Sequence, residues 1–170
     1  MNIPQHTPNR QRLTILARTG DIHSTLTATR DSSLATICSD AIRSGYEVAK
    51  QCIGRGCSYQ DAVDFLLLGL PPAQGAELLA RDGFLRPTLL MAEHGVLNEV
   101  AAEAIATGYS KGKNLIGHGV SYVDAAKFVM LSPNREAFYP ILAGDGFLIC
   151  SHHIKTCLLY TSPSPRDATL

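Results

Sequence analysis

The chain has 170 residues and a mass of 18.3 kDa, enough for one domain with a core of its own and too little for two large domains. Apolar residues make up 45%, as in a globular protein, and fifteen Lys and Arg balance fifteen Asp and Glu. A dedicated nucleic-acid binder needs an excess of positive charge, so this balance disfavours a nucleic-acid partner. No apolar run is long enough to span a bilayer, and the start, MNIPQHTPNRQR, lacks the apolar region of a secretory signal. We therefore expect no membrane contact and a protein that is cytoplasmic, or exported without a conventional signal peptide.

Short helices separated by glycines are predicted along the chain, so the expected class is all-α. Apolar residues follow the three–four spacing of a buried helix face from Val96 to Ile105 and again from Ala125 to Leu131. β-Branched residues nowhere alternate with polar ones for more than a few positions, so strands are not expected. Five glycines follow or close apolar segments: Gly83, Gly95, Gly108, Gly119 and Gly146. They predict helices of two to three turns that each end in a left-handed glycine.

Two serines mark predicted helix starts. Ser58 stands before an apolar stretch and three residues ahead of Asp61. Ser121 stands in the same relation to Asp124, and this is the capping-box spacing with Asp in place of Glu or Gln. Pro140, within REAFYPILAG, is expected to weaken or kink the helix predicted there.

The dominant feature is an internal repeat at an offset of 63 residues. AIRSGYEVAKQCIGRGCSYQDAVDFLLLG (41–69) aligns without gaps with AIATGYSKGKNLIGHGVSYVDAAKFVMLS (104–132), and DGFL follows in both copies. Over residues 41–85, 20 of 45 positions are identical to their counterparts. Upstream, LARTGDI (16–22) aligns with LARDGFL (79–85). The copies therefore occupy about 16–78 and 79–141, with part of a third from 142.

Such a unit of short helices cannot bury its own apolar face, whereas stacked units can cover one another. We therefore predict one helical-repeat domain over residues 1–156, an α-solenoid of short helix pairs. An array that stops without a polar capping unit would leave an apolar face uncovered and prone to self-association or fraying.

The stretch DGFLRPTLLMAEHGVLNEVAAEAIATG (82–108) resembles an ankyrin repeat. In the family's order it carries an Asp–Gly turn, Thr-Leu and Ala of a first helix, Gly-x-Leu-x-x-Val and a closing glycine. A second candidate runs over 121–144, and LTILARTGDI (13–22) resembles the junction of the family's two helices. The resemblance implies two unequal ankyrin-like units in each 63-residue copy. The Thr-Pro-Leu-His tetrapeptide of the family is missing throughout, so another helical solenoid stays open as an alternative.

Polar and aromatic residues that recur in both copies are the candidate functional residues. They are the pairs Tyr46/Tyr109, Lys50/Lys113, Ser58/Ser121, Tyr59/Tyr122, Asp61/Asp124 and Asp82/Asp145. One interpretation is structural: helix caps, Asp–Gly turns and tyrosines with buried rings. The other is that Tyr46, Lys50, Tyr109 and Lys113 form a ladder that binds a protein partner, since positions i and i+4 share a helix face.

The cysteines, histidines and glycine-rich segments of the chain do not predict a catalytic, metal or phosphate site. Cys52 and Cys57 correspond to Leu115 and Val120 in the second copy, which indicates core packing of both cysteines. The cluster ICSHHIKT offers three Cys or His ligands, where zinc needs about four. In KQCIGRG and KNLIGHG the lysine precedes the glycines, so neither is a phosphate-binding loop. We expect no catalytic residue, no cofactor and no metal.

The C-terminal segment has a separate origin. CLLYTSPSPRD (157–167) matches the conceptual translation of a transposase-type sequencing-library adapter, read through from an environmental sequence. We therefore expect residues 157–170 to be an artefactual disordered tail, and the natural gene to continue past about Thr156.

The function predicted from these features is that of a helical-repeat module that binds a protein partner on one face and is not an enzyme. The alternative is the repeat-bearing fragment of a larger enzyme or secreted bacterial effector whose catalytic part is missing. A helical-repeat nucleic-acid binder would need a basic face, for which five residues could be gathered: Arg43, Lys50, Arg55, Lys111 and Lys113.

Overall fold

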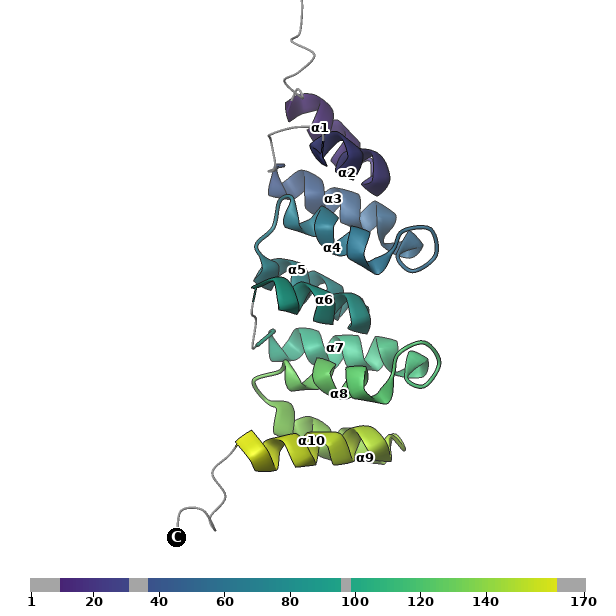
Figure 1. Cartoon of the computed structure of the whole chain (residues 1–170), viewed down its shortest axis with the longest axis vertical. Helices are drawn as coiled ribbons and strands as arrows, with labels where there is room; N and C mark the ends of the chain where they lie inside the picture. The colour runs from purple at the N-terminus through teal and green to yellow at the C-terminus, as the bar shows by residue number, and fades with distance from the viewer. Residues whose placement is uncertain (1–9, 31–36, 96–98, 162–170) are drawn as a thin grey trace, which may run out of the picture. The chain divides into compact units, whose positions relative to one another are not determined.

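The structure, a computed structural model, describes residues 10–30, 37–95 and 99–161, with side chains to residue 157. Within those ranges the chain is all-α, with ten α-helices and no β-strand (Figure 1). None of the helices found there is long and apolar enough to cross a membrane. The chain divides into two compact units, Met1–Gly75 and Ala76–Leu170, and the boundary falls inside α5 (Pro72–Arg81).

Unit 1 consists of two successive helix pairs. Its helices are α1 (Arg10–Arg18), α2 (Ile22–Arg30), α3 (Ser39–Ala49) and α4 (Tyr59–Leu67), with the 3-10 helix η1 (Lys50–Cys52) after α3. α1 packs against α2 and α3, and α4 packs against α2 and α3, so the first pair lies on the second. The core is made of Leu13, Ile22, Leu26, Ile42, Tyr46, Phe65 and Leu66.

Unit 2 continues with pairs of the same kind after the C-terminal part of α5. Its remaining elements are α6 (Leu85–Gly95), α7 (Ala102–Gly112), η2 (Lys113–Leu115), α8 (Tyr122–Met130), η3 (Arg135–Ala137), α9 (Phe138–Gly144) and α10 (Leu148–Thr161). α8 packs against α6, α7 and α10, and α9 packs against α10. Its core is made of Leu79, Leu85, Met91, Ile105, Phe128, Leu142 and Ile154.

The predicted serine caps are present in both units. The backbone N–H of Asp61 donates to Ser58 Oγ at 3.0 Å, and that of Asp124 donates to Ser121 Oγ at 3.0 Å. Each bond satisfies one of the N–H groups that a helix start leaves without an intrahelical acceptor. The capping prediction is confirmed.

The predicted glycine ends are confirmed at two positions and wrong at a third. Gly83 and Gly146 have φ of +83° and +89°, and each lies in the turn before the next helix. Gly108 lies inside α7, where a Cβ would overlap the carbonyl oxygen of Ala80. The helix continues through Gly108 because this glycine serves close helix packing and does not reverse the chain.

The same close approach occurs 63 residues earlier. Gly45 lies inside α3, and a Cβ there would overlap the carbonyl oxygen of Ala17 in α1. The matching sequences of the two copies therefore have matching local packing. Of the other predicted ends, Gly95 is the last residue of α6, and Gly119 lies in the loop before α8 with φ of +128°.

Two expectations about the C-terminal region change. Pro140 is the third residue of α9, in the first turn, where its missing N–H has no intrahelical acceptor, so the helix begins around it. α10 continues to Thr161, so the prediction of disorder is wrong for residues 157–161, whose sequence contains no helix breaker. Residues 162–170 lie outside the described residues.

Candidate interaction surface

The two ladder tyrosines lie in the core of their units. Tyr46 is 1% exposed and Tyr109 is 3% exposed, so neither ring offers surface to a partner. The expectation of an exposed tyrosine row is therefore corrected. The physical reason is that burial of a large aromatic ring contributes to packing, and the Tyr109 ring, for example, meets that of Phe138.

The Tyr109 hydroxyl takes part in a small polar network in unit 2. It donates to Asp145 Oδ2 at 2.6 Å, while Lys113 Nζ lies 3.6 Å from the same oxygen. The ring meets that of Phe138 edge to face, with centroids 6.1 Å apart. Burial, followed by the hydrogen bond to Asp145, raises the pKa of Tyr109 well above its usual value. The network ties the end of α7 to the turn between α9 and α10, which is a structural role.

The two ladder lysines are partly exposed and have acidic neighbours. Lys50 Nζ lies 2.8 Å from Glu47 Oε2, and Lys113 pairs with Asp145 as described. Among the other basic residues considered for a nucleic-acid face, Arg43 donates to the side chain of Gln74 at 2.7 Å. These contacts place the cations in local pairs, and the role of the lysines in partner binding stays a prediction.

Each copy carries a tightly hydrogen-bonded loop between its 3-10 helix and the next helix. In unit 1, Gly54 N–H donates to the Cys57 carbonyl at 2.7 Å, and Cys57 N–H donates to the Cys52 carbonyl at 3.0 Å. In unit 2, Gly117 N–H donates to the Val120 carbonyl at 2.7 Å. The Tyr122 ring lies against Gly117, much as that of Tyr59 lies against Gly54. The loops are thus fixed supports for the side chains around them.

The exposed side chains around the unit 2 loop include Leu115, His118, Tyr122 and Val123. We call these four residues the turn-end surface. Leu115 ends η2, while Tyr122 and Val123 begin α8, so the loop brings them to the same end of the helix pair. An aromatic and two aliphatic side chains on a fixed support can bind an apolar patch of another protein.

Of these four residues, only Tyr122 was a candidate from the sequence, because the candidates were positions that recur; Leu115 was expected in the core with Cys52, and its exposure corrects that expectation. Leu115 and Val123 replace Cys52 and Gln60 of the first copy. The signal that could have found them is an apolar residue in one copy at a position that is polar, or differs, in the other. His118 also differs from its counterpart in the first copy, Arg55.

The cysteines divide into exposed and buried ones. Cys57 is buried, as predicted, and its loss of hydration raises the pKa of its thiol to about 11, with further contributions from Asp61 and Cys52. Cys52 is exposed, so the core prediction is wrong for that residue, because it ends η1 at the surface. Cys150 is buried and donates to the Tyr122 carbonyl at 3.2 Å.

The histidines near the C-terminus form no metal site in the described part of the chain. His153 Nε2 lies 3.6 Å from Cys157 Sγ, and no group of three or more Cys, His, Asp or Glu there could hold a metal ion. This pair alone provides too few ligands for zinc.

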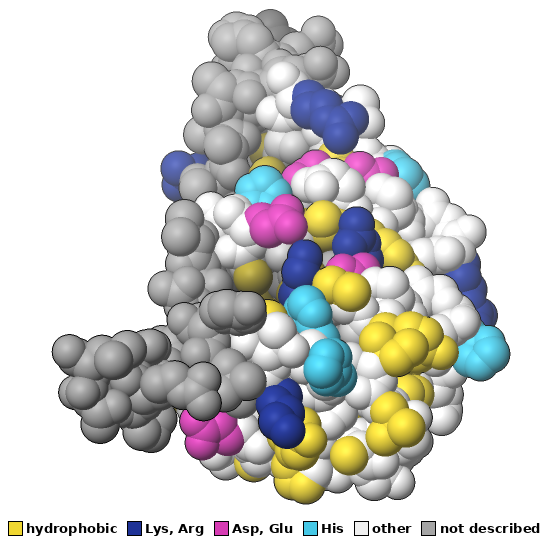
Figure 2. Space-filling model, turned by 60° about the horizontal axis from the view of Figure 1, so that its bottom comes forward, with side chains coloured by type: hydrophobic (Ala, Val, Ile, Leu, Met, Phe, Trp, Pro, Cys, Tyr) yellow, Lys and Arg dark blue, Asp and Glu magenta, His cyan; other side chains and the backbone are white. Residues whose placement is uncertain are grey.

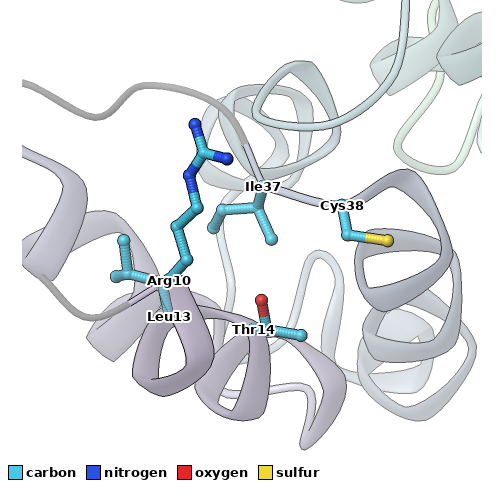
Figure 3. A pocket seen from close by; sticks show the side chains of 5 residues that line it. All are labelled: Arg10, Leu13, Thr14, Ile37 and Cys38. Atoms are coloured by element: carbon cyan, nitrogen blue, oxygen red, sulfur yellow. The ribbon is translucent and has the colours of Figure 1, made fainter.

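Unit 1 contains a pocket of about 280 Å³ between α1 and the start of α3. Arg10, Leu13 and Thr14 line one side and Ile37 and Cys38 the other (Figure 3). The Thr14 hydroxyl and the Ile37 side chain point toward one another across it. These lining residues include one cation and neither a carboxylate nor an imidazole, so they contain no acid–base pair for catalysis.

Comparison of the chain with known protein families, curated proteins and solved structures gives no match.

Proposed function

We propose that this chain is a protein-interaction module of the helical-repeat type, an α-solenoid of ankyrin-like or related helix pairs, which binds a protein partner through the turn-end surface of unit 2. The observation that carries the proposal is the exposure of Leu115, Tyr122 and Val123 beside one hydrogen-bonded loop. The loop holds them in place, so binding costs little conformational freedom.

A division between repeated and variable positions supports this assignment. The repeated residues Gly108, Tyr109 and Ser121 each hold the helices together, through close packing, burial or a cap. Leu115 and Val123 differ between copies and are exposed, so their identity is free to follow the needs of a partner. Repeat proteins commonly use a constant framework with variable surface positions in this way.

The chemistry of the surface indicates an apolar partner patch. Tyrosine and large aliphatic side chains supply the buried centre of protein interfaces, while charged residues are depleted there. The formal net charge of the chain is zero, so long-range attraction of an oppositely charged partner is not what selects it.

Chemical crosslinking and affinity capture with the tagged chain as bait test the proposal. We expect the double variant Leu115→Ser/Val123→Ser to capture about one tenth of the partner that the wild type captures, or less. Central interface residues typically contribute more than about 1 kcal/mol each. The control bait is Ile15→Ser/Ile141→Ser, which removes exposed apolar residues of α1 and α9.

Equal capture by both variants would contradict the turn-end surface, and capture no greater than by the tag alone would contradict the binding function. The variant Lys113→Ala in the same assay tests the lysine part of the predicted ladder. Far-UV circular dichroism of each bait shows whether its helices remain intact.

A further inference from the structure

The outer face of the α9–α10 pair is more exposed at one register position than the matching faces elsewhere. Leu148, the first residue of α10, is 69% exposed. The residues at its position in α6 and α2 are Leu85, which is 2% exposed, and Ile22, which is 4% exposed. Figure 2 brings the α9–α10 end of unit 2 forward and shows hydrophobic side chains open on that side. An apolar residue at one register position is thus buried twice and exposed once.

The burial of Leu85 has a specific cause in unit 2. Its side chain lies against Gly112 at the end of α7, where a Cβ would overlap it. The neighbouring turn is covered by the same helix, since a Cβ on Gly83 would lie 2.9 Å from the Cβ of Lys111. α7 and α8, the pair that follows in the chain, therefore cover the face that Leu85 occupies.

The α1–α2 pair of unit 1 has an equivalent cover. A Cβ on Gly20 would lie 2.9 Å from the Cβ of Val48 in α3, the first helix of the following pair. At Gly146, in the matching turn of α9–α10, the described residues leave open space within 4 Å. The third turn has the conformation of the other two, with φ of +89° against +83°, but not their neighbour.

A second register position separates the effect of a covering pair from exposure that is present with or without one. Ile15 in α1 and Ile141 in α9 occupy the same register, and both are exposed although the α1–α2 pair is covered. Coverage by a following pair therefore buries the Leu148 register and leaves the Ile141 register open. Ile141 is the matched control for Leu148.

We infer that the face of α9–α10 around Leu148 and Gly146 is the docking face for a further helix pair of the α3–α4 and α7–α8 type, placed in the 63-residue register after α10. The interface it would form continues those seen twice in the structure, α1–α2 with α3–α4 and α5–α6 with α7–α8. This surface is distinct from the turn-end surface, and the inference does not rest on the proposed function.

The face also specifies features of its occupant. The two observed covering helices have a glycine at the Gly45 and Gly108 position, so that the helices can approach closely. They are followed by an aspartate, Asp61 or Asp124, which lies close to a polar side chain of the covered face: His23 at 3.6 Å or Arg86 at 2.9 Å. The matching residue of α10 is Ile149, which is exposed. The occupant is therefore expected to carry the glycine and to have an apolar residue in place of the aspartate.

An extended chain tests the inference. Residues 1–155 are fused to a second copy of residues 93–133, which places another α7–α8 pair in the 63-residue register after α10. A second version carries Asp124→Leu in the added copy, to suit Ile149. We expect the added pair to cover Leu148, so that Leu148→Asp lowers Tm by roughly 5–10 °C in an extended chain and by less than about 2 °C in the original chain. Ile141→Asp is expected to change Tm little in either.

Amide hydrogen exchange provides an independent measurement of the same contact. Exchange in α9 and the first turns of α10 is expected to slow at least tenfold on extension. It is expected not to slow when Gly108 of the added copy is replaced by leucine, which blocks close approach of the helices. Equal effects of Leu148→Asp in the original chain and both extended chains, or unchanged exchange in both extensions, would overturn the inference. So would sedimentation of the original chain as a dimer that Leu148→Asp dissociates, because a second copy would then be the occupant.

Discussion

Individual residues that recur in the two copies have packing roles. Gly45 and Gly108 allow a carbonyl oxygen of a neighbouring helix to approach the helix axis, and Tyr46 and Tyr109 fill the core beside them. Glycine within a helix costs about 1 kcal/mol relative to alanine. The close packing that glycine permits offsets this cost, which explains why the helix-breaking tendency of the residue is tolerated here.

The first prediction concerns Gly108. Gly108→Ala is expected to lower the free energy of unfolding by about 1–3 kcal/mol, because the added Cβ overlaps the Ala80 carbonyl and forces the helices apart. Gly144→Ala is the control, since a Cβ there meets nothing within 4 Å and alanine is the better helix former, so a gain of up to about 1 kcal/mol is expected. Urea unfolding followed by circular dichroism measures both. Equal stability of the two variants would contradict this account of the glycine.

The second prediction concerns the pH dependence given by Tyr109. Its pKa is raised in the folded chain above the value of about 10 in the unfolded chain, so the neutral phenol stabilises the fold below pH 10. That stabilisation is lost as pH rises above about 10, where the unfolded chain ionises first. Tyr109→Phe is expected to cost about 1–2 kcal/mol at pH 7, through the lost hydrogen bond to Asp145, and progressively less toward pH 11.

The measurement for Tyr109 is the free energy of unfolding of both proteins at several pH values. Tyr122→Phe, which removes an exposed hydroxyl, is the control for the substitution itself. A difference between wild type and Tyr109→Phe that stays constant from pH 7 to pH 11 would contradict the prediction.

Helices and turns in this chain are defined by local chemistry at their ends. α4 and α8 begin at a serine whose Oγ accepts a backbone N–H, and the turns before α6 and α10 contain a left-handed glycine. The loops at 53–57 and 116–120 share most of their backbone hydrogen bonds, although their sequences differ at the tip. The loop backbone is therefore held independently of the exposed side chains, which leaves those side chains free to differ.

The third prediction tests a helix start. Ser121→Ala is expected to lower the free energy of unfolding by about 1 kcal/mol, because one N–H of the first turn of α8 loses its acceptor. Ser58→Ala is expected to cost a similar amount at α4. Ser110→Ala, at an exposed position inside α7, is the control and is expected to change stability by less than about 0.5 kcal/mol. A larger effect at Ser110 than at Ser121 would contradict the cap.

At the level of the whole molecule, stability comes from apolar burial and not from charge. The side chains that fill the two cores are aliphatic and aromatic, while the ion pairs among the described residues involve partly exposed groups such as Arg81 and Glu77. Exposed pairs of this kind contribute little and are screened by salt. The chain also has no net charge whose self-repulsion salt could relieve.

The fourth prediction follows from this balance. Between about 0.05 and 0.5 M sodium chloride, the free energy of unfolding is expected to change by less than about 1 kcal/mol. Sodium sulfate is expected to stabilise the chain more than sodium chloride at the same ionic strength, because it strengthens apolar burial. Urea unfolding at each salt concentration measures the effect, and a strong loss of stability in sodium chloride would show that ion pairs carry more of the fold than their exposure indicates.

Much of the candidate site could not be predicted, for a reason visible at Tyr46 and Leu115. Recurrence in the sequence marks residues that the unit needs, and Tyr46 recurs because it is buried, so the search for repeated residues found the core. Leu115 differs between copies and, as an apolar counterpart of Cys52, was expected in the core, although it is exposed beside the loop. Exposure depends on which helices pack together, and no local pattern records that.

The sequence by itself determined the all-α class, the serine caps at Ser58 and Ser121 and the glycine turns at Gly83 and Gly146, because each depends on residues within one turn of one another. Only the tertiary structure decided that Gly108 lies inside a helix, that Tyr109 is buried and that Leu148 is exposed while Leu85 is not. Those outcomes depend on contacts between segments far apart in the chain. A leucine at the same place in a repeat is buried or exposed according to whether another helix pair covers it, and that is a property of the packing.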